Sequence, residues 1–403
     1  MAGVKRPLGL YLHIPFCRQK CLYCDFLSAP ALQHTVDRYV KALAVQLERE
    51  ASRYRDFRVA TVFFGGGTPS LLSAKQMDML METIRKQYDL AADAEVTMES
   101  NPGTLDEKKL AGYKKAGINR LSMGLQSACD EELKNLGRIH DFAAFLENFR
   151  AAREAGFSNI NVDLMSALPG QTLEAWMETL EKTAALEPEH ISAYSLIIEE
   201  GTPFWARYGE TEEKGGDSKG KAPWPALPSE EEERRMYEQT ENYLKEKGYL
   251  RYEISNYART GKECLHNTGY WRRTDYAGFG LGAASLVDNV RWKITDELEE
   301  YLEYFGHDMQ EGEPWKRERC VLTQKEQMEE FMFLGLRLSD GISLHEFRRL
   351  FGKGIWEVYG TVIKKLEEQG LILFYEDGKK LRLTAYGVDI SNYVLSQFLL
   401  EEE

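Results

Sequence analysis

The sequence predicts an α/β fold: a partial, TIM-like (β/α)6 barrel followed by a winged-helix-like α+β domain. Three observations predict it. Short apolar runs alternate with amphipathic helical stretches from residue 8 to about residue 198. Glycines stand just past two of these stretches, where helices commonly end. Residues 318–403 instead show helices followed by a hairpin. A doubly wound open sheet is the competing architecture for the first part.

Six short apolar runs are the predicted barrel strands. They cover residues 8–14, 61–64, 95–99, 120–123, 161–164 and 190–195. Five intervening stretches repeat apolar residues at helical spacing, at 36–52, 75–88, 106–116, 142–155 and 173–186. Gly117 and Gly156 follow two of these predicted helices, as expected for residues that adopt a left-handed backbone without steric cost. Strands alternating with helices of this length predict parallel βαβ units.

The composition divides the chain into four consecutive parts. They are a barrel core, a flexible insertion loop rich in Gly, Lys, Glu and Pro, a connecting segment, and the winged-helix-like domain. Their predicted bounds are 1–208, 209–229, 230–317 and 318–403. The connecting segment is expected to begin with a helix at 230–248 and to continue as an aromatic, β-like segment at 250–292.

The last part is expected to contain three helices, at 322–338, 343–351 and 355–369, and a hairpin at 371–383. The Asp377-Gly378 pair supplies its turn. Winged-helix modules often bind DNA, but residues 318–403 hold 11 Lys and Arg against 15 Asp and Glu, a net charge of −4. A DNA reader needs a basic surface, so a packing or lid role is favoured and a transcription factor is not.

The overall composition favours an acidic globular protein of the cytoplasm. The 403 residues carry a net charge of −14, which disfavours nucleic-acid and anionic-membrane binding. The longest apolar runs are too short to span a membrane. Three of the six cysteines fall within eight residues and the others are scattered. This distribution predicts a reducing compartment and one local thiolate site rather than a disulfide framework.

Cys17, Cys21 and Cys24 form that local site, with C-x3-C-x2-C spacing. They follow the first predicted strand and therefore lie at the barrel face where active sites are built. Three thiolates can hold an inorganic cluster and leave one metal position open, because a cubane cluster usually takes four cysteines. Free thiols, or a structural zinc ion with His13 as the fourth ligand, are the alternatives.

The surrounding sequence, LYLHIPFCRQKCLYCDF, resembles the radical S-adenosylmethionine (SAM) superfamily. It is most similar to the branch that contains oxygen-independent coproporphyrinogen III oxidase and its heme-chaperone (HemW-like) relatives. The resemblance covers nearly the whole chain. It implies a radical SAM barrel in which the three thiolates bind a [4Fe–4S] cluster and SAM chelates the fourth iron. It also implies an electron donor for the cluster, whose electron cleaves the SAM sulfonium.

Other residues at the predicted strand ends are candidate SAM contacts. The Gly-rich turn after the second strand contains Gly66, Gly67 and Thr68, and glycine permits close approach of a ligand. Polar residues that end or interrupt later strands are expected to converge on the same face. By resemblance, the residues that contact SAM or pack near the cluster are Tyr11, Tyr23, Gly66, Gly67, Thr68, Glu99, Gln126, Arg138, Asp163 and Ile197.

Two features indicate the heme-chaperone branch. The oxidase carries a further cysteine where this sequence has Phe26. The sequence His266-Asn267-Thr268-Gly269-Tyr270-Trp271 matches the HNxxYW motif of the heme-binding relatives. Imidazole can ligate heme iron, and aromatic rings suit a porphyrin face. The candidate heme contacts are therefore His266, Asn267, Tyr270 and Trp271. An ordinary aromatic core with one hydrogen-bonded His is the alternative. Ala284 stands where relatives commonly carry His. If that His helps to bind heme or adenosine, binding of these ligands is expected to be weaker or different in this protein.

The expected function is therefore a radical SAM protein that binds heme and passes it to an acceptor protein. Oxidative decarboxylation of coproporphyrinogen III is the alternative, although Phe26 counts against it. Release of 5′-deoxyadenosine without a porphyrin product would indicate a third possibility, an unidentified radical substrate. The sequence does not identify the acceptor or the oligomeric state.

Overall fold

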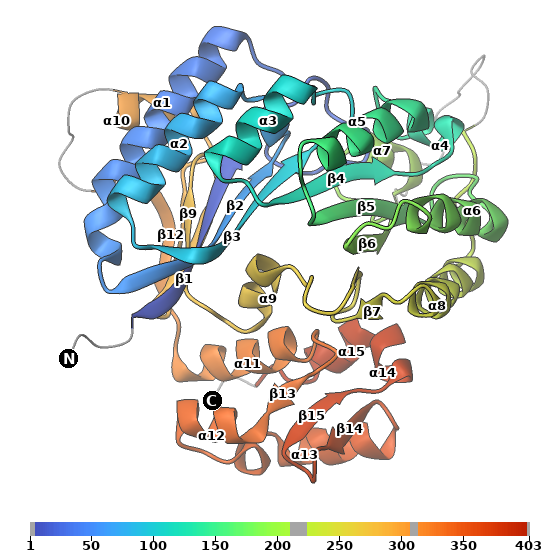
Figure 1. Ribbon diagram of the computed structural model, residues 1–403. Coiled ribbons are helices and arrows are strands. Elements are labelled where there is room, and N and C mark those ends of the chain that lie inside the picture. Colours follow the sequence, from blue (N-terminus) through green and yellow to red (C-terminus); the bar gives the residue numbers. More distant parts are fainter. Residues whose placement is uncertain (1–4, 210–223, 307–312, 401–403) are drawn as a thin grey trace.

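The computed structural model describes residues 5–209, 224–306 and 313–400. Its core is a row of six parallel strands, with helices packed along their outer side (Figure 1). The strands are β1 (Arg6–Ile14), β2 (Phe57–Gly66), β3 (Leu90–Ser100), β4 (Arg120–Gln126), β5 (Ile160–Ser166) and β6 (His190–Ser195). All six predicted strands are confirmed. Their order follows the chain without reversal, which is the order of a barrel and not of a doubly wound sheet.

The five predicted barrel helices are also confirmed. They are α1 (Gln33–Glu50), α2 (Ala74–Gln87), α3 (Glu107–Ala116), α5 (Phe142–Glu154) and α6 (Leu173–Ala184). Gly117 ends α3 with a φ of 98°, and Gly156 follows α5 with a φ of 87°, as the sequence predicts. The structure adds four short elements: η1 (Ala51–Tyr54), η2 (Pro69–Leu71), α4 (Asp130–Asn135) and α7 (Pro203–Tyr208).

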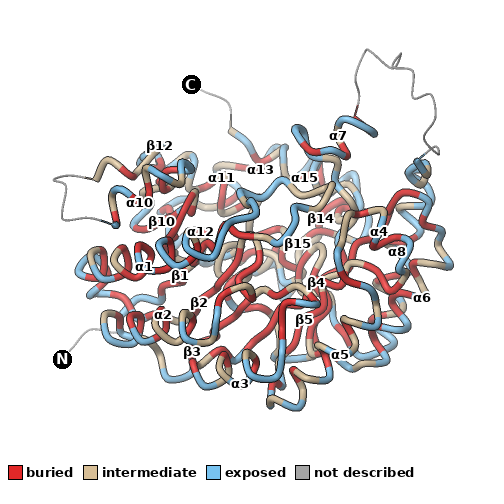
Figure 2. Tube along the Cα trace, turned by 90° about the horizontal axis from the view of Figure 1, so that it is seen from above, coloured by how far each residue is buried: buried red, intermediate tan, exposed pale blue. Residues whose placement is uncertain are grey.

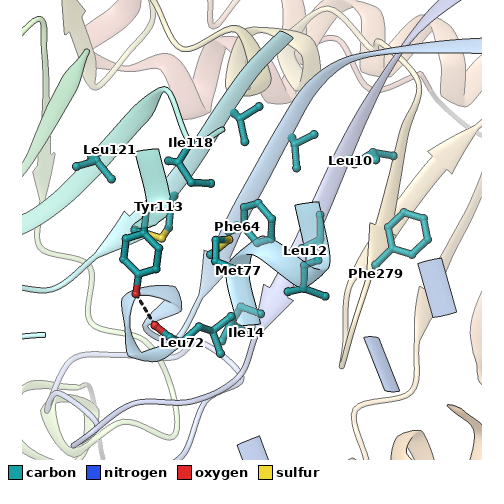
Figure 3. Packing of buried hydrophobic residues seen from close by; sticks show 14 of the residues in the cluster. Leu10, Leu12, Ile14, Phe64, Leu72, Met77, Tyr113, Ile118, Leu121 and Phe279 are labelled. Atoms are coloured by element: carbon teal, nitrogen blue, oxygen red, sulfur yellow. Dashed lines mark hydrogen bonds between the residues drawn. The ribbon is translucent and has the colours of Figure 1, made fainter. Parts of the chain in front are cut away.

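The strands form because alternate side chains are apolar and are covered by the outer helices, while intervening polar side chains such as Glu99 and Asp163 face the barrel interior. Leu8, Leu10, Leu12 and Ile14 of β1 are fully buried. Figure 3 shows Leu10, Leu12 and Ile14 close to side chains of β2 and the outer helices, among them Phe64. The view from above shows buried strands in the middle of the molecule and more exposed helices around them (Figure 2). The core thus holds the carboxyl ends of the strands in fixed positions.

The main sheet continues beyond the six barrel strands on both sides. β9 (Tyr276–Phe279) pairs parallel with β1, and β10 (Ala284–Val287), β11 (Val290–Ile294) and β12 (Lys316–Val321) follow as antiparallel neighbours. On the other side, β8 (Asn256–Ala258) pairs antiparallel with β6, and β7 (Leu250–Arg251) pairs with β8. The predicted boundary between residues 317 and 318 falls inside β12, and the division into domains stays a prediction.

The predicted helix at 230–248 is α8 (Glu230–Glu246), but the aromatic segment after it is only partly β. Residues Leu265–Trp271 form helix α9, so the prediction of a β-like segment across 250–292 is wrong at this point. The reason is a tertiary contact: Glu95 of β3 accepts hydrogen bonds from the first backbone N–H groups of α9. α10 (Leu298–Gly306) packs against α1. Residues 210–223 of the predicted insertion lie outside the described residues.

The predicted carboxyl-terminal helices and hairpin are confirmed and have their own core, which includes Phe347, Ile363 and Leu381. Its elements are α11 (Gln324–Gly335), β13 (Ile342–Ser343), α12 (Leu344–Phe351), α13 (Ile355–Glu368), β14 (Ile372–Tyr375), β15 (Lys380–Leu383), α14 (Ala385–Asp389) and α15 (Ser391–Ser396). β13, α14 and α15 were not expected. Figure 1 shows α9 between the barrel and α11. Within the described ranges, no helix is long and apolar enough to cross a membrane.

Candidate functional site

A cavity of about 310 Å³ lies at the carboxyl ends of the barrel strands. All three clustered thiols line it, and so do seven of the ten residues predicted to contact SAM. Those seven are Tyr23, Gly66, Gly67, Glu99, Gln126, Arg138 and Asp163. Residues from the loop after β1 and from the ends of β2, β3, β4 and β5 therefore meet at one place, as the barrel topology requires. We refer to it as the thiol cavity.

The loop after β1 holds the thiols by backbone contacts on both of its sides. The Cys17 N–H donates to the Ala29 carbonyl (3.1 Å), which folds the loop back on itself. The Leu22 N–H donates to the Leu136 carbonyl (3.0 Å), and this contact joins the loop to the segment after α4. Cys17, Cys21 and Cys24 are all half-buried. Three thiols on a fixed loop, facing one cavity, fit a shared inorganic centre.

Neighbouring polar groups also contact the sulfur atoms. The Thr68 hydroxyl donates to Cys17 Sγ and the Arg138 guanidinium donates to Cys21 Sγ, each at 3.5 Å. Burial raises the pKa of the Cys24 thiol, a backbone hydrogen bond from Phe26 opposes this, and the Cys21 thiol raises the pKa further. Donors in these positions can also hydrogen-bond the sulfur atoms of a bound cluster.

His13 does not complete this set in the structure. Its Nε2 bonds the Leu27 carbonyl (2.8 Å) and its Nδ1 bonds the Tyr11 hydroxyl (3.0 Å), so both ring nitrogens are engaged. The zinc alternative with His13 as fourth ligand therefore finds no support.

Two carboxyl groups line the thiol cavity with different surroundings. Glu99 Oε2 accepts the Gly66 N–H (3.0 Å), and burial, followed by the charge of Asp163, raises the pKa of Glu99 to about 8. Asp163 accepts hydrogen bonds from Ser122 (3.0 Å) and Asn161 (2.7 Å). Burial nevertheless raises the pKa of Asp163. At neutral pH a protonated Glu99 can both donate to and accept from a polar ligand.

Arg138 is fixed by two acceptors from neighbouring strands. Its Nη2 donates to the Asn101 amide oxygen (2.8 Å) and to the Gly124 carbonyl (2.6 Å). Asn101 in turn donates to Thr68 (2.8 Å), so a single polar chain connects the groups that contact Cys17 and Cys21. The sequence analysis missed Asn101. Its position two residues after Glu99, beyond the end of the same strand, was the available signal.

Gln126 reaches the cavity through an irregular strand end. The pairing of β4 with β5 shifts register between Gly124 and Gln126, and Gln126 has a φ of 74°. A bulge of this kind redirects a side chain, and strained backbone is frequent at functional sites. Ser122, Met165 and Tyr194 also line the cavity and were not predicted.

Three of the predicted SAM contacts lie outside the described lining of the thiol cavity: Tyr11, Thr68 and Ile197. Thr68 acts on the cavity through Cys17 and Asn101, as described above. Ile197 is 67% exposed. The Tyr11 ring lines a different cavity of about 320 Å³, next to α9. We refer to that second space as the aromatic cavity.

Helix α9 carries the HNxxYW motif, and Glu95 holds its first turn. The carboxylate accepts the N–H groups of Leu265 (3.0 Å) and His266 (3.1 Å). His266 and Tyr270 lie one helical turn apart on the same face of α9. Tyr270 and Trp271 line the aromatic cavity, and the guanidinium of Arg337 lies 4.3 Å from the centre of the Trp271 ring.

His266 is buried and both of its ring nitrogens are hydrogen-bonded. Nδ1 bonds the Thr61 hydroxyl and Nε2 bonds the Tyr270 hydroxyl, each at 2.8 Å. Burial, and then the charge of Arg120, lowers the pKa of His266 to about 3, so the ring is neutral at pH 7. A neutral imidazole is the form that binds iron, but Nε2 is free only when the Tyr270 contact opens. Asn267 is half-buried, and Ala284 lines the aromatic cavity.

Comparisons with known proteins agree with this fold and cavity. The Radical SAM superfamily matches residues 11–183, and the HemN C-terminal domain family matches residues 322–390. A solved structure, coproporphyrinogen III oxidase (HemN) from Escherichia coli, is similar with a TM-score of 0.81 and 25% identity. That similarity covers 98% of this chain and 90% of the oxidase. The barrel and the carboxyl-terminal domain are thus those of the radical SAM fold of the HemN type.

Two relatives define the branch more closely. The heme chaperone HemW of Bacillus subtilis is 36% identical over 392 residues, covering 97% of this chain and 99% of the relative. The heme chaperone HemW of Escherichia coli is 42% identical over 283 residues, covering 70% of each chain. The chain belongs to the HemW family. The resemblance stated from the sequence is therefore confirmed.

Proposed function

We propose that the protein is a heme chaperone of the cytoplasm, which binds heme and delivers it to an acceptor protein. The observation that carries the proposal is the match, over nearly the full length, to proteins named heme chaperone HemW. Phe26 supports it. This side chain is 65% exposed and lines the thiol cavity at the place where the oxidase branch carries an additional cysteine.

We propose that Cys17, Cys21 and Cys24 hold a [4Fe–4S] cluster and that SAM occupies the rest of the thiol cavity. The fit rests on three half-buried thiols that line one cavity together with polar groups on both sides. When bound, the cluster would supply one electron, taken from an external donor, to the sulfonium of SAM.

The chain's own residues would bind and orient SAM. Gly66 and Gly67 are required by the packing behind the cavity wall: a Cβ on Gly67 would meet the Phe16 carbonyl oxygen at 2.7 Å, and one on Gly66 would meet the His13 ring at 2.5 Å. Both glycines line the thiol cavity, where SAM would meet a wall without side chains.

Arg138 would attract a ligand carboxylate by its positive charge, while Asn101, Gly124 and Cys21 hold its Nη atoms in place. Glu99, with its raised pKa, can share a hydrogen bond with the ligand's polar groups.

Heme binding is proposed to involve His266, with Asn267, Tyr270 and Trp271 nearby. Support comes from the neutral state of the His266 ring and from the aromatic side chains around α9. To ligate iron through Nε2, His266 must exchange its hydrogen bond with Tyr270 for the metal. Tyr270 therefore acts as the group that competes with heme for His266.

Anaerobic reconstitution followed by heme titration tests the proposed function. We expect one heme per chain, lost in His266→Ala, and transfer of the bound heme to a heme-depleted acceptor. Binding of heme no tighter than that of an unrelated control protein contradicts the proposal.

The similarity to the solved oxidase favours a second candidate, oxidative decarboxylation of coproporphyrinogen III. Incubation of the reconstituted protein with that substrate, SAM and a reductant would show the decarboxylated porphyrinogen if this function held. Phe26 in place of the additional cysteine leads us to expect no such product.

A further inference from the structure

The aromatic cavity is distinct from the thiol cavity and is bounded by parts of the chain far apart in sequence. Tyr11 comes from β1, Tyr270 and Trp271 from α9, Tyr276 from β9 and Leu334 from α11. The barrel and the carboxyl-terminal domain therefore each supply walls. Its volume of about 320 Å³ lies within the usual range of ligand cavities, about 300–1,000 Å³.

The walls of the aromatic cavity suit a flat apolar ligand. The Tyr270 and Tyr276 rings meet edge to face with their centroids 4.6 Å apart. Aliphatic side chains, Leu286 from β10 and Leu334 from α11, complete the lining. Rings in this arrangement present both faces and edges to a planar aromatic partner.

One edge of the aromatic cavity carries two guanidinium groups. Arg291 lines the cavity, and its guanidinium bonds Glu330 at 2.8 Å. Arg273 bonds the other oxygen of the same carboxylate at 2.9 Å. Two guanidinium groups thus share one carboxylate, and Arg291 keeps 40% of its side chain exposed. A ligand with its own carboxylate would complete this charge balance.

A neighbouring cavity of about 240 Å³ is the competing location, because His266 lines it. It shares Tyr270 and Tyr276 with the aromatic cavity. Its lining, as far as the structure describes it, includes the Asp275 carboxylate and no Lys or Arg. Asp275 is already paired with Arg6 (3.4 Å), so the described lining of the neighbouring cavity offers no cation to a carboxylate-bearing ligand, whereas the aromatic cavity offers Arg291.

We propose that the aromatic cavity between α9 and α11 holds the porphyrin ring of the cargo, with a propionate at Arg291. This inference rests on the proposed function. It assigns a role to the carboxyl-terminal domain: Leu334 of α11 closes the site against the barrel.

Two variants test the location in full-length, reconstituted protein. Leu334→Trp fills the cavity from the α11 side and should weaken heme binding about tenfold or more. Leu350→Trp is the matched control, because Leu350 is an exposed leucine on α12. Ala60→Trp fills the neighbouring cavity instead and should weaken heme binding less than Leu334→Trp does.

Arg291→Gln tests whether Arg291 binds a propionate of heme. This test remains valid even if Leu334→Trp fails to fold. Wild-type protein should bind heme roughly tenfold more tightly than heme dimethyl ester, and Arg291→Gln should lose this preference. Arg319→Gln, on the exposed face of β12, is the control.

Thermal unfolding and cluster content establish that each variant is folded. The proposed location of heme would be overturned by any of three results. These are wild-type-like heme binding by folded Leu334→Trp, an unchanged preference for heme over its ester in Arg291→Gln, and loss of heme binding in Ala60→Trp but not in Leu334→Trp. Failure of the wild-type protein itself to bind heme would instead overturn the proposed function.

Discussion

Tyr270→Phe is expected to tighten heme binding. In the structure the Tyr270 hydroxyl bonds His266 Nε2 at 2.8 Å, and ligation of iron by this nitrogen requires that the contact be broken. The substitution keeps the aromatic ring that lines the cavity and removes only the oxygen. The free protein thus loses a hydrogen bond that the heme-bound protein no longer has.

The size of the effect follows from the net worth of one such hydrogen bond, about 0.5–1.5 kcal/mol. Since every 1.4 kcal/mol changes a dissociation constant tenfold, heme affinity should rise roughly two- to twelvefold. The free energy of unfolding of the heme-free variant should fall by the same amount, about 0.5–1.5 kcal/mol, because both effects come from the loss of one hydrogen bond in the heme-free protein.

Soret titration of anaerobically prepared protein measures the affinity, and urea unfolding of the heme-free form measures the stability. His266→Ala is the reference in which binding is lost. Weakened binding in Tyr270→Phe, comparable to that in His266→Ala, would refute the reasoning and would make the Tyr270 oxygen itself a heme contact.

Three further predictions concern the cap of α9 and the thiol cavity. Glu95→Gln should lower the free energy of unfolding by about 1–3 kcal/mol in urea unfolding, because the carboxylate that caps α9 is lost. Asp93→Asn, at an exposed position of the same strand, is the control and should not change it. Equal effects of the two substitutions would contradict the capping role of Glu95. Because burial and Asp163 raise the pKa of Glu99 from 4.5 to about 8, the folded state binds its proton more tightly. Stability should therefore fall between pH 4.5 and about 8, less so in Glu99→Gln, and parallel pH profiles would exclude this contribution. Asn101→Ala should weaken SAM binding about tenfold in equilibrium dialysis, since Arg138 loses one of its acceptors; unchanged affinity would show that Asn101 does not position Arg138.

The barrel could be predicted because its signals are local. In the run from Leu8 to Ile14 the alternate positions are apolar, and the structure buries all four of these side chains. The three clustered cysteines are likewise a short-range pattern, and the structure places all of them on one cavity. Helix α9 could not be predicted in this way, because the carboxylate that caps it belongs to Glu95 on a distant strand.

The surroundings of the candidate heme contacts could not be predicted from the sequence either. The sequence marks His266 as a possible iron ligand, but Thr61, which bonds its Nδ1, lies more than two hundred residues away. The aromatic cavity joins Tyr11 and Leu334, which no local pattern connects. Ile197, taken from resemblance alone, is an exposed side chain. Contacts between distant segments decide these cases, and sequence spacing does not report them.

Absorption spectra of anaerobically purified protein, before and after heme addition, test most directly whether one chain carries two separate centres. We predict iron–sulfur absorbance that is lost when Cys17, Cys21 and Cys24 are replaced together by Ser, while the Soret band remains. In His266→Ala the Soret band should be lost and the iron–sulfur absorbance kept. Loss of both signals in either variant, or absence of iron and sulfide from the wild-type protein, would contradict the account.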